Sequence, residues 1–224
     1  MSDTTGTITD EGVERLRARI GIPEPHPMPP HYREPGIDAF RAVAEAYGDD
    51  NRLWCDPDYA KGTRWGGPIA SPVLVGGDTL IGEDEVTAVA DEHRDLMKGD
   101  PLRGVHAFYS ASEREWWAPL RPGHRVTRRN ALVGVLDKSS DFADRAIHEW
   151  TAQVFRADDG TILSGQYRLM IRTERSKARK RAKNADVELT TYTDDQIAEI
   201  DAQYASEGPR GAEPRWWEDV AVGD

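Results

Sequence analysis

Apolar residues recur at helical spacing in two segments near the start of the chain. The first segment, residues 10–20, ends at Gly21, and the second, residues 37–47, ends at Gly48. The first apolar stripe consists of Val13, Leu16 and Ile20, and the second of Ile37, Phe40, Val43, Ala44 and Tyr47. Between the two segments, residues 22–36 contain too many prolines for a helix or a central strand, which predicts an extended connector.

The middle of the chain has the pattern of an antiparallel sheet. Runs rich in β-branched and aromatic residues predict strands near residues 105–113, 125–136, 146–156 and 161–172. The last two runs are joined by Asp158-Asp159-Gly160, a strong hairpin signal. In the final strand apolar and polar residues alternate, which predicts one buried and one solvent-exposed face. The buried face would hold Tyr167, Leu169 and Ile171, and the exposed face Gln166 and Arg168.

Capping residues predict two further helices. Ser71 followed by Pro72 is a favourable helix start, because the hydroxyl caps and a proline in the first turn loses no hydrogen bond. The apolar segment that follows is expected to be buried. Residues 193–196 form a capping box that opens a helix ending at Gly208. The pattern as a whole predicts an α+β domain, in which a long helix lies against an antiparallel sheet of four or five strands.

Charge and cysteine content exclude several classes of function. The chain has 224 residues with 29 basic and 40 acidic side chains, a formal net charge of −11. We therefore expect no binding to nucleic acid or to an anionic membrane, and we interpret the basic run after Ile171 as a solvated strand exit. The single cysteine, Cys55, excludes an internal disulfide and suits a reducing compartment. No apolar run approaches the ~20 residues that span a bilayer, and the acidic N-terminus lacks the layout of a secretion signal, so a soluble cytoplasmic protein is expected.

The loop between the second helix and Ser71 has a distinctive pattern. It contains Gly48-Asp49-Asp50-Asn51-Arg52-Leu53-Trp54, then Asp56-Pro57-Asp58-Tyr59-Ala60, then Thr63-Arg64-Trp65-Gly66-Gly67-Pro68-Ile69-Ala70. This resembles the hydratase loop of MaoC-type hot-dog-fold enoyl-CoA hydratases, whose pattern is Gly-Asp-x-Asn-Pro-Leu-His followed by Asp-x-x-Tyr-Ala. Residues 113–126 and the tail from Thr191 are similar to the N-terminal half of double-hot-dog members, often called FAS1-like.

The resemblance covers residues 10–224 and implies a hot-dog fold, in which an antiparallel sheet wraps around a central helix. It also implies a CoA-thioester substrate and no cofactor. On this basis the chain divides into four parts: a helical segment (1–21), the connector (22–36), a hot-dog domain (37–175) and a C-terminal part (176–224). The last part would hold a basic linker, a helix, and the start of a linker to a second hot dog or a tail that docks on a partner.

Two departures from the family pattern remove catalytic groups. In active members an Asp and a His of this loop act together as acid and base on the enoyl thioester. Here Asp49 holds the Asp position, but Trp54 stands at the His position and has only an indole N–H donor. Active members also read Ile-Ala-His-Gly at the helix entrance, where the glycine N–H polarises the thioester carbonyl. This chain has Pro72 there, which has no N–H, and such a donor contributes typically ~2.7–4 kcal/mol.

The remaining candidate residues have two interpretations each. Asn51, Trp54, Arg64 and Ser71 are the expected substrate-binding residues. Trp54 would fill the space of the missing imidazole, and Arg64 would meet a CoA phosphate or serve only as a surface residue. His106 and His124 are candidates for a relocated acid or base, against structural roles on a strand and in a turn. The histidine spacing predicts no metal site, and Cys55 is interpreted as a small apolar filler.

Three functions are compatible with the sequence. The first is the catalytically silent half of an enoyl-CoA hydratase or dehydratase, which shapes the acyl pocket and pairs, as a homodimer or heteromer, with an active hot-dog chain. The tryptophans Trp216 and Trp217 are then expected to dock on a partner. The second is a non-enzymatic acyl-CoA-binding dimer, and the third is a stand-alone hydratase with an unusual acid/base set. Fold alone does not choose among them.

Overall fold

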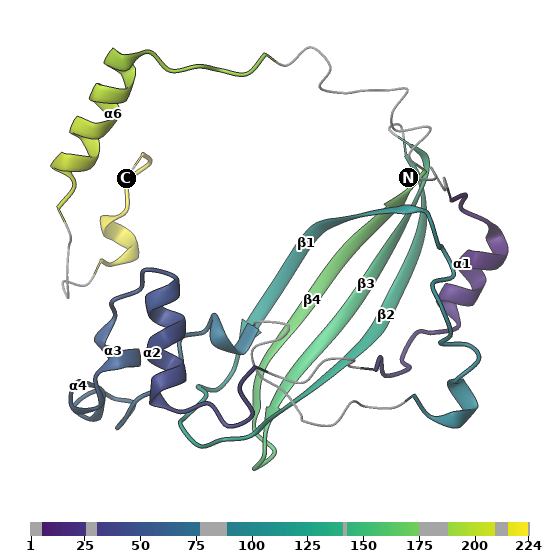
Figure 1. Ribbon diagram of the computed structural model, residues 1–224, viewed down its shortest axis with the longest axis horizontal. Coiled ribbons are helices and arrows are strands. Elements are labelled where there is room, and N and C mark those ends of the chain that lie inside the picture. Colours follow the sequence, from purple (N-terminus) through teal and green to yellow (C-terminus); the bar gives the residue numbers. More distant parts are fainter. Residues whose placement is uncertain are drawn as a thin grey trace. The chain divides into compact units, whose positions relative to one another are not determined.

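The computed structural model describes residues 6–25, 31–76, 89–140, 143–174, 188–208 and 215–223. The chain divides into two units, residues 1–182 and residues 183–224. The first unit contains a four-stranded antiparallel sheet in the order β1-β4-β3-β2 (Figure 1). The strands are β1 (His106–Trp116), β2 (Val126–Ser140), β3 (Asp144–Ala157) and β4 (Ile162–Thr173). The predicted antiparallel sheet is therefore confirmed, and its strands extend a few residues beyond the apolar runs.

The predicted N-terminal helices are also present. They are α1 (Asp10–Arg17), capped by Thr9, and α2 (Ile37–Ala46). The apolar stripe of each helix is shorter than the sequence pattern indicated, because Ile20 and Tyr47 lie past the last helical residue and are exposed. In the connector, Pro23 forms an isolated β-bridge with Ala131.

The loop after α2 contains two short helices that the sequence pattern did not indicate. They are α3 (Arg52–Cys55) and α4 (Pro57–Lys61). The segment after Ser71 starts with a single 3-10 turn, η1 (Leu74–Gly76), and a second, η2, spans Asp91–His93. The rest of the central helix expected after Ser71 falls outside the described residues.

Along β4 the alternation correctly predicted the burial of Leu169, but it was wrong for Gln166 and Tyr167. Gln166 is only 3% exposed, whereas Tyr167 is 43% exposed. The amide of Gln166 lies on the face that packs against the rest of the unit, where its Nε2 lies 3.4 Å from the hydroxyl oxygen of Tyr109. A polar amide can be buried in this way when it has a hydrogen-bond partner, so alternation of polarity alone did not identify the covered face.

Two apolar clusters lie at opposite ends of this covered face. One joins α2 and η1 to Val126 and Phe155, and the other joins α1 to Leu132 and Ile147. Between them a row of polar residues crosses the sheet, with Asn130, Gln153 and Gln166 aligned in register. The Nε2 of Gln153 donates to Oδ1 of Asn130 over 2.8 Å. The core of this unit is therefore divided into two parts.

The second unit contains α6 (Asp194–Ser206) and a 3-10 turn, η3 (Trp217–Asp219). The predicted capping box is present: Thr193 Oγ1 accepts the N–H of Gln196, and Gln196 Oε1 accepts the N–H of Thr193. All side chains of α6 are exposed. Among the described residues, no helix combines the length and apolar character needed to cross a membrane.

Candidate functional site

The hydratase-like loop holds Asp49 by its own backbone. The chain leaves α2 through Gly48, whose φ of 70° is readily adopted only by glycine. Asp49 Oδ1 then accepts the backbone N–H of Asn51 over 3.0 Å. Asn51 in turn caps α3, because its Oδ1 accepts the N–H of Leu53. Asn51 is therefore a capping residue at the start of α3.

The second oxygen of this carboxylate is bound by the residue at the histidine position. The indole Nε1–H of Trp54 donates to Asp49 Oδ2 over 2.8 Å. Both carboxylate oxygens thus accept a hydrogen bond from within the loop. Trp54 supplies a donor but no proton acceptor, so this pair has no base other than Asp49 itself.

A mostly apolar pocket of about 400 Å³ lies next to this loop. Its lining residues come from α3, from the 64–75 segment and from the residues at the end of β1. They are Leu53, Trp54, Arg64, Trp65, Ile69, Ala70, Pro72, Val75, Trp116, Trp117, Ala118, Pro119 and Leu120. Four of these are tryptophans and one is charged, as expected for a site that binds an apolar group. We call it the tryptophan pocket.

Two of the tryptophans are fixed by contacts with neighbouring segments. Trp116 Nε1 donates to the carbonyl oxygen of Pro72 over 3.0 Å. The ring of Trp117 lies over Gly165 of β4, so close that a Cβ added at Gly165 would be 2.7 Å from the ring. The pocket wall therefore depends on the absence of a side chain at one position of the sheet.

The helix entrance offers an acceptor where the family pattern has a donor. Pro72 lines the pocket and has no N–H, and its carbonyl is already bound by Trp116. Ser71 is buried beside it, and its carbonyl accepts the N–H of Leu74. No backbone N–H of residue 72 is available to stabilise a developing oxyanion.

The sequence-predicted site residues are only partly brought together. Trp54, Arg64 and Pro72 line the tryptophan pocket, whereas Asp49, Asn51 and Ser71 are not among its lining residues. Sequence reasoning missed Trp65, Trp116 and Trp117 as pocket residues. The signal was present in the adjacent tryptophans Trp116 and Trp117, which sit where a strand ends and a proline-containing turn begins.

The other candidate groups lie away from the pocket. His106 stacks edge-to-face with Phe108 on β1, and His124 Nδ1 lies 3.1 Å from Asp158 Oδ1. Neither histidine lines the tryptophan pocket. Cys55 is half-buried, and burial raises the pKa of its thiol, which makes the thiolate less available. The described residues contain no group of three or more His, Cys, Asp or Glu that could hold a metal ion.

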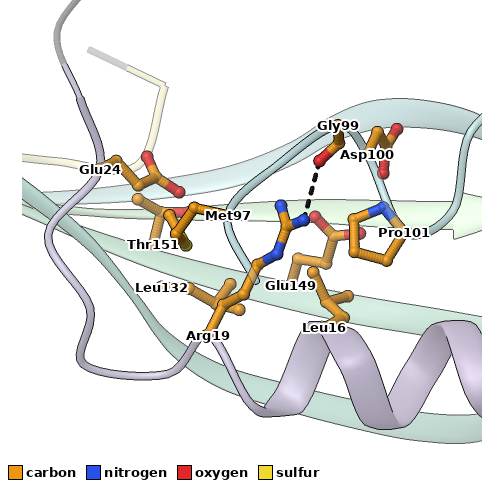
Figure 2. Close-up of a pocket in the computed structure, with 10 residues that line it drawn as sticks. All are labelled: Leu16, Arg19, Glu24, Met97, Gly99, Asp100, Pro101, Leu132, Glu149 and Thr151. Carbon is orange, nitrogen blue, oxygen red and sulfur yellow. Dashed lines mark hydrogen bonds between the residues drawn. The ribbon is translucent and has the colours of Figure 1, made fainter. Parts of the chain in front are cut away.

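A second cavity, of about 230 Å³, lies between α1 and the sheet (Figure 2). Arg19 reaches across it and donates to the carbonyl oxygen of Gly99 (Figure 2). It also donates to the carbonyl oxygen of Lys98. Burial raises the pKa of Glu149, while the guanidinium of Arg172, 3.6 Å from its carboxylate, opposes that rise. Arg172 also pairs with Asp100. The charged groups around this cavity therefore interact with one another.

Comparison with known proteins identifies the fold. No family model matches the sequence, and no curated protein does. Among solved structures, the ChsH1-ChsH2 complex from Mycobacterium tuberculosis matches with a TM-score of 0.52 and 18% identity, over 73% of this chain and 90% of that one. The chain has a hot-dog fold. The expected α+β class, with an antiparallel sheet and helices, is thereby confirmed.

Other hot-dog structures are similar at lower scores. R-hydratase PhaJ1 from Pseudomonas aeruginosa has a TM-score of 0.45 and 15% identity, over 80% of this chain and 92% of that chain. The HadBC 3R-hydroxyacyl-ACP dehydratase complex from Mycobacterium tuberculosis has a TM-score of 0.46 and 15% identity, over 68% of this chain and 96% of that chain.

Proposed function

We propose that this chain is one half of a MaoC-like acyl-CoA hydratase or dehydratase, and that it binds the acyl group without performing the chemistry. The observation that carries the proposal is the hydrogen bond from Trp54 to Asp49. It occupies the carboxylate that would act as base, and it comes from the position where an active family member holds its histidine.

Two groups needed for hydration of an enoyl thioester are missing from this chain. Hydration of an α,β-enoyl thioester requires a base that removes a proton from water and an acid that protonates the α-carbon. It is also accelerated by a donor to the thioester oxygen, on which negative charge develops. Trp54 and Pro72 replace two of these groups with an indole donor and a tertiary amide. The chain would therefore need a partner for turnover.

The tryptophan pocket supports the binding part of the proposal. Among the described residues its walls are indole, proline and aliphatic side chains, with Arg64 as the one charged residue of that lining. Such a surface favours an acyl group over water through burial of apolar area. The pocket exists although Trp54 stands at the histidine position, because the indole is turned toward Asp49. No cofactor enters this proposal, since the thioester itself is the reactant.

The partner would pair along β1. This strand is at one edge of the sheet, whereas the other edge strand, β2, is bridged by the connector at Pro23. Among the described residues no strand pairs with the outer side of β1, and Phe108, Tyr109 and Trp116 on it are exposed. An edge strand of this length with aromatic side chains is a template for strand pairing. The ChsH1-ChsH2 structure is itself a complex of two chains.

The first test measures binding and turnover on the same sample. Purified chain is mixed with a short and a long trans-2-enoyl-CoA, and loss of the enoyl-thioester absorbance is followed alongside calorimetric binding. We expect binding without turnover. Turnover by the chain alone would refute the silent role, and absence of binding by a folded sample would refute the acyl site.

The open pocket also favours a second candidate, a non-enzymatic acyl-CoA-binding dimer. The two functions are separated by the double variant Trp54→His/Pro72→Gly, which restores the acid/base partner and the backbone donor. In a silent hydratase half this variant should gain weak turnover. A binding module should gain none, so no gain from a well-folded double variant would favour the second candidate.

A further inference from the structure

The cavity between α1 and the sheet combines charged and apolar lining residues (Figure 2). Among the described residues, the charged ones are Arg19, Glu24, Asp100 and Glu149, and the apolar ones are Leu16, Met97, Pro101 and Leu132. The volume of about 230 Å³ exceeds the roughly 150 Å³ in which a buried cavity can hold a benzene ring. The space is therefore large enough for a small organic molecule that has both polar and apolar parts.

Arg19 brings an unused donor to this cavity. Its Nη2 atom donates to the carbonyl oxygens of Lys98 and Gly99, and these two bonds hold the guanidinium in place. Its Nε atom is buried and has no hydrogen-bond partner among the described residues. Because both bound groups are neutral carbonyls, these contacts do not balance the charge of the guanidinium. A carboxylate from a ligand would balance that charge and accept the free N–H.

Glu149 brings an unused acceptor to the same cavity. Its side chain is only 14% exposed, and its Oε1 atom lacks a hydrogen-bond partner within the described part of the chain. The Nε atom of Arg172 lies 3.6 Å away, too far for a hydrogen bond, and this arginine already donates to Asp100 Oδ2 over 2.7 Å. Burial raises the pKa of Glu149, as expected for a carboxylate that is short of donors. An ammonium group from a ligand would supply a donor and a balancing charge.

We infer that this cavity binds a small zwitterion of the α-amino-acid type with an apolar side chain. The ligand's carboxylate accepts from Arg19 Nε, its ammonium donates to Glu149 Oε1, and its hydrocarbon part packs on the apolar lining residues. A cation alone would leave Arg19 unmatched, and an anion alone would leave Glu149 unmatched. The inference is independent of the proposed acyl-thioester function, because this cavity and the tryptophan pocket share no residue in their described linings.

The test compares three ligands that carry the same isobutyl group. L-leucine has both charged groups, 3-methylbutylamine lacks the carboxylate, and 4-methylpentanoate lacks the ammonium. Calorimetry on the full chain at pH 7 should show leucine binding about tenfold more tightly than either analogue. Equal affinity for all three would show that only the hydrocarbon is recognised, which would overturn the inference. Absence of leucine binding by a folded sample would also overturn it and indicate a cavity that holds only water.

Two variants assign each charged group of leucine to its partner. Glu149→Gln should weaken binding of leucine and 3-methylbutylamine about tenfold without weakening 4-methylpentanoate, which has no ammonium. Arg19→Gln should weaken leucine and 4-methylpentanoate by a similar factor and leave 3-methylbutylamine unaffected. A variant that weakens all three ligands equally would show that the inferred pairing is wrong.

The matched control for Arg19 is Arg15→Gln. The Nη2 atom of Arg15 also donates to backbone carbonyls of the same loop, those of Asp95 and Lys98, but Arg15 does not line the cavity. Arg15→Gln should therefore bind leucine as the parent chain does. Equal losses in Arg15→Gln and Arg19→Gln would show that Arg19 only anchors the loop, and its role as a carboxylate ligand would be overturned.

Discussion

At the scale of single residues, the hydrogen bond between Trp54 and Asp49 defines the candidate site. The indole N–H of Trp54 donates to Asp49 Oδ2, and the same residue lines the tryptophan pocket. In the sequence, Trp54 marks only the loss of the catalytic histidine of the family pattern. In the structure, Trp54 also has a structural role. It joins the two ends of the turn that leads from α2 into α3.

Replacing Trp54 by phenylalanine removes the indole donor of this hydrogen bond and keeps an aromatic ring. The ring remains as a filler, but Asp49 Oδ2 loses its donor in a half-buried position. We expect a loss of about 1 kcal/mol in the free energy of unfolding, measured by urea denaturation. The matched control is Trp217→Phe, at a tryptophan that is 86% exposed, and it should change little. Equal effects of the two substitutions would argue against a specific bond.

Gly165 is the residue on which the position of Trp117 depends. In Gly165→Ala the new methyl group would lie 2.7 Å from the Trp117 ring, so the indole must move. We expect weaker binding of a hexanoyl thioester in the tryptophan pocket, by a factor of about ten for a displaced aromatic wall.

The comparison variant is Gly134→Ala on β2. There the added methyl would meet Trp150 at 3.6 Å, an ordinary contact distance. Binding should therefore be unchanged in Gly134→Ala. Similar loss of affinity in both variants would point to a general disturbance of the sheet.

At the scale of elements, strand patterns were the most predictable feature. The β-branched runs predicted the number of strands and the hairpin at residues 158–160. A hairpin pairs residues that lie close together in the sequence, so a short sequence window contains its signal. The covered face of β4 was not predictable in the same way. Gln166 is buried by residues far away in the sequence, and its polarity suggested the opposite face.

The candidate site likewise combines residues that are close together in the sequence with residues that are far apart. Loop residues such as Asp49 and Trp54 could be recognised from their spacing, since they lie close together in the chain. The walls from Trp116 and Trp117 reach the pocket only because β1 ends beside Pro72. No pattern within a short window contains that contact.

Helix α1 is tied to the sheet by an ion-pair cluster around Arg145. The Nη2 atom of Arg145 lies 2.6 Å from Asp137 Oδ2 on β2 and 2.7 Å from Asp10 Oδ1 on α1. The bond from Arg145 holds the pKa of Asp137 below its ordinary value. A carboxylate whose pKa is lowered by folding adds stability above its unfolded pKa, about 3.9, and loses it as the pH falls through the folded value.

Arg145→Gln should therefore cost stability at neutral pH and cost progressively less below about pH 4. The loss at pH 7 should be about 1 kcal/mol, since the cluster is partly exposed. Denaturation midpoints of parent and variant between pH 3 and 7 give the measurement. A difference that stays constant over this range would mean that Arg145 acts through packing alone.

At the scale of the whole molecule, the partner site that we propose is the β1 edge of the sheet. Two exposed aromatic residues provide a comparison: Phe108 on the edge strand β1 and Tyr167 on the inner strand β4. We expect the chain to dimerise through β1 and Phe108→Lys to shift it toward monomer, because charge on an edge strand opposes strand pairing.

Light scattering after size exclusion measures the mass of each variant. Tyr167→Lys should leave the dimer intact. A parent chain that stays monomeric at every concentration, or a dimer equally weakened by both lysines, would show that β1 does not mediate self-association.

The polar row of Asn130, Gln153 and Gln166 has a consequence for how this protein can change over time. Because it separates the apolar cluster under α2 from the one under α1, a new side chain in one cluster has few neighbours in the other. Mutations that reshape the tryptophan pocket can accumulate while the α1 end keeps the sheet folded. Substitutions at one end of the sheet can therefore change which ligand is bound, while the apolar cluster at the other end maintains the stability of the fold.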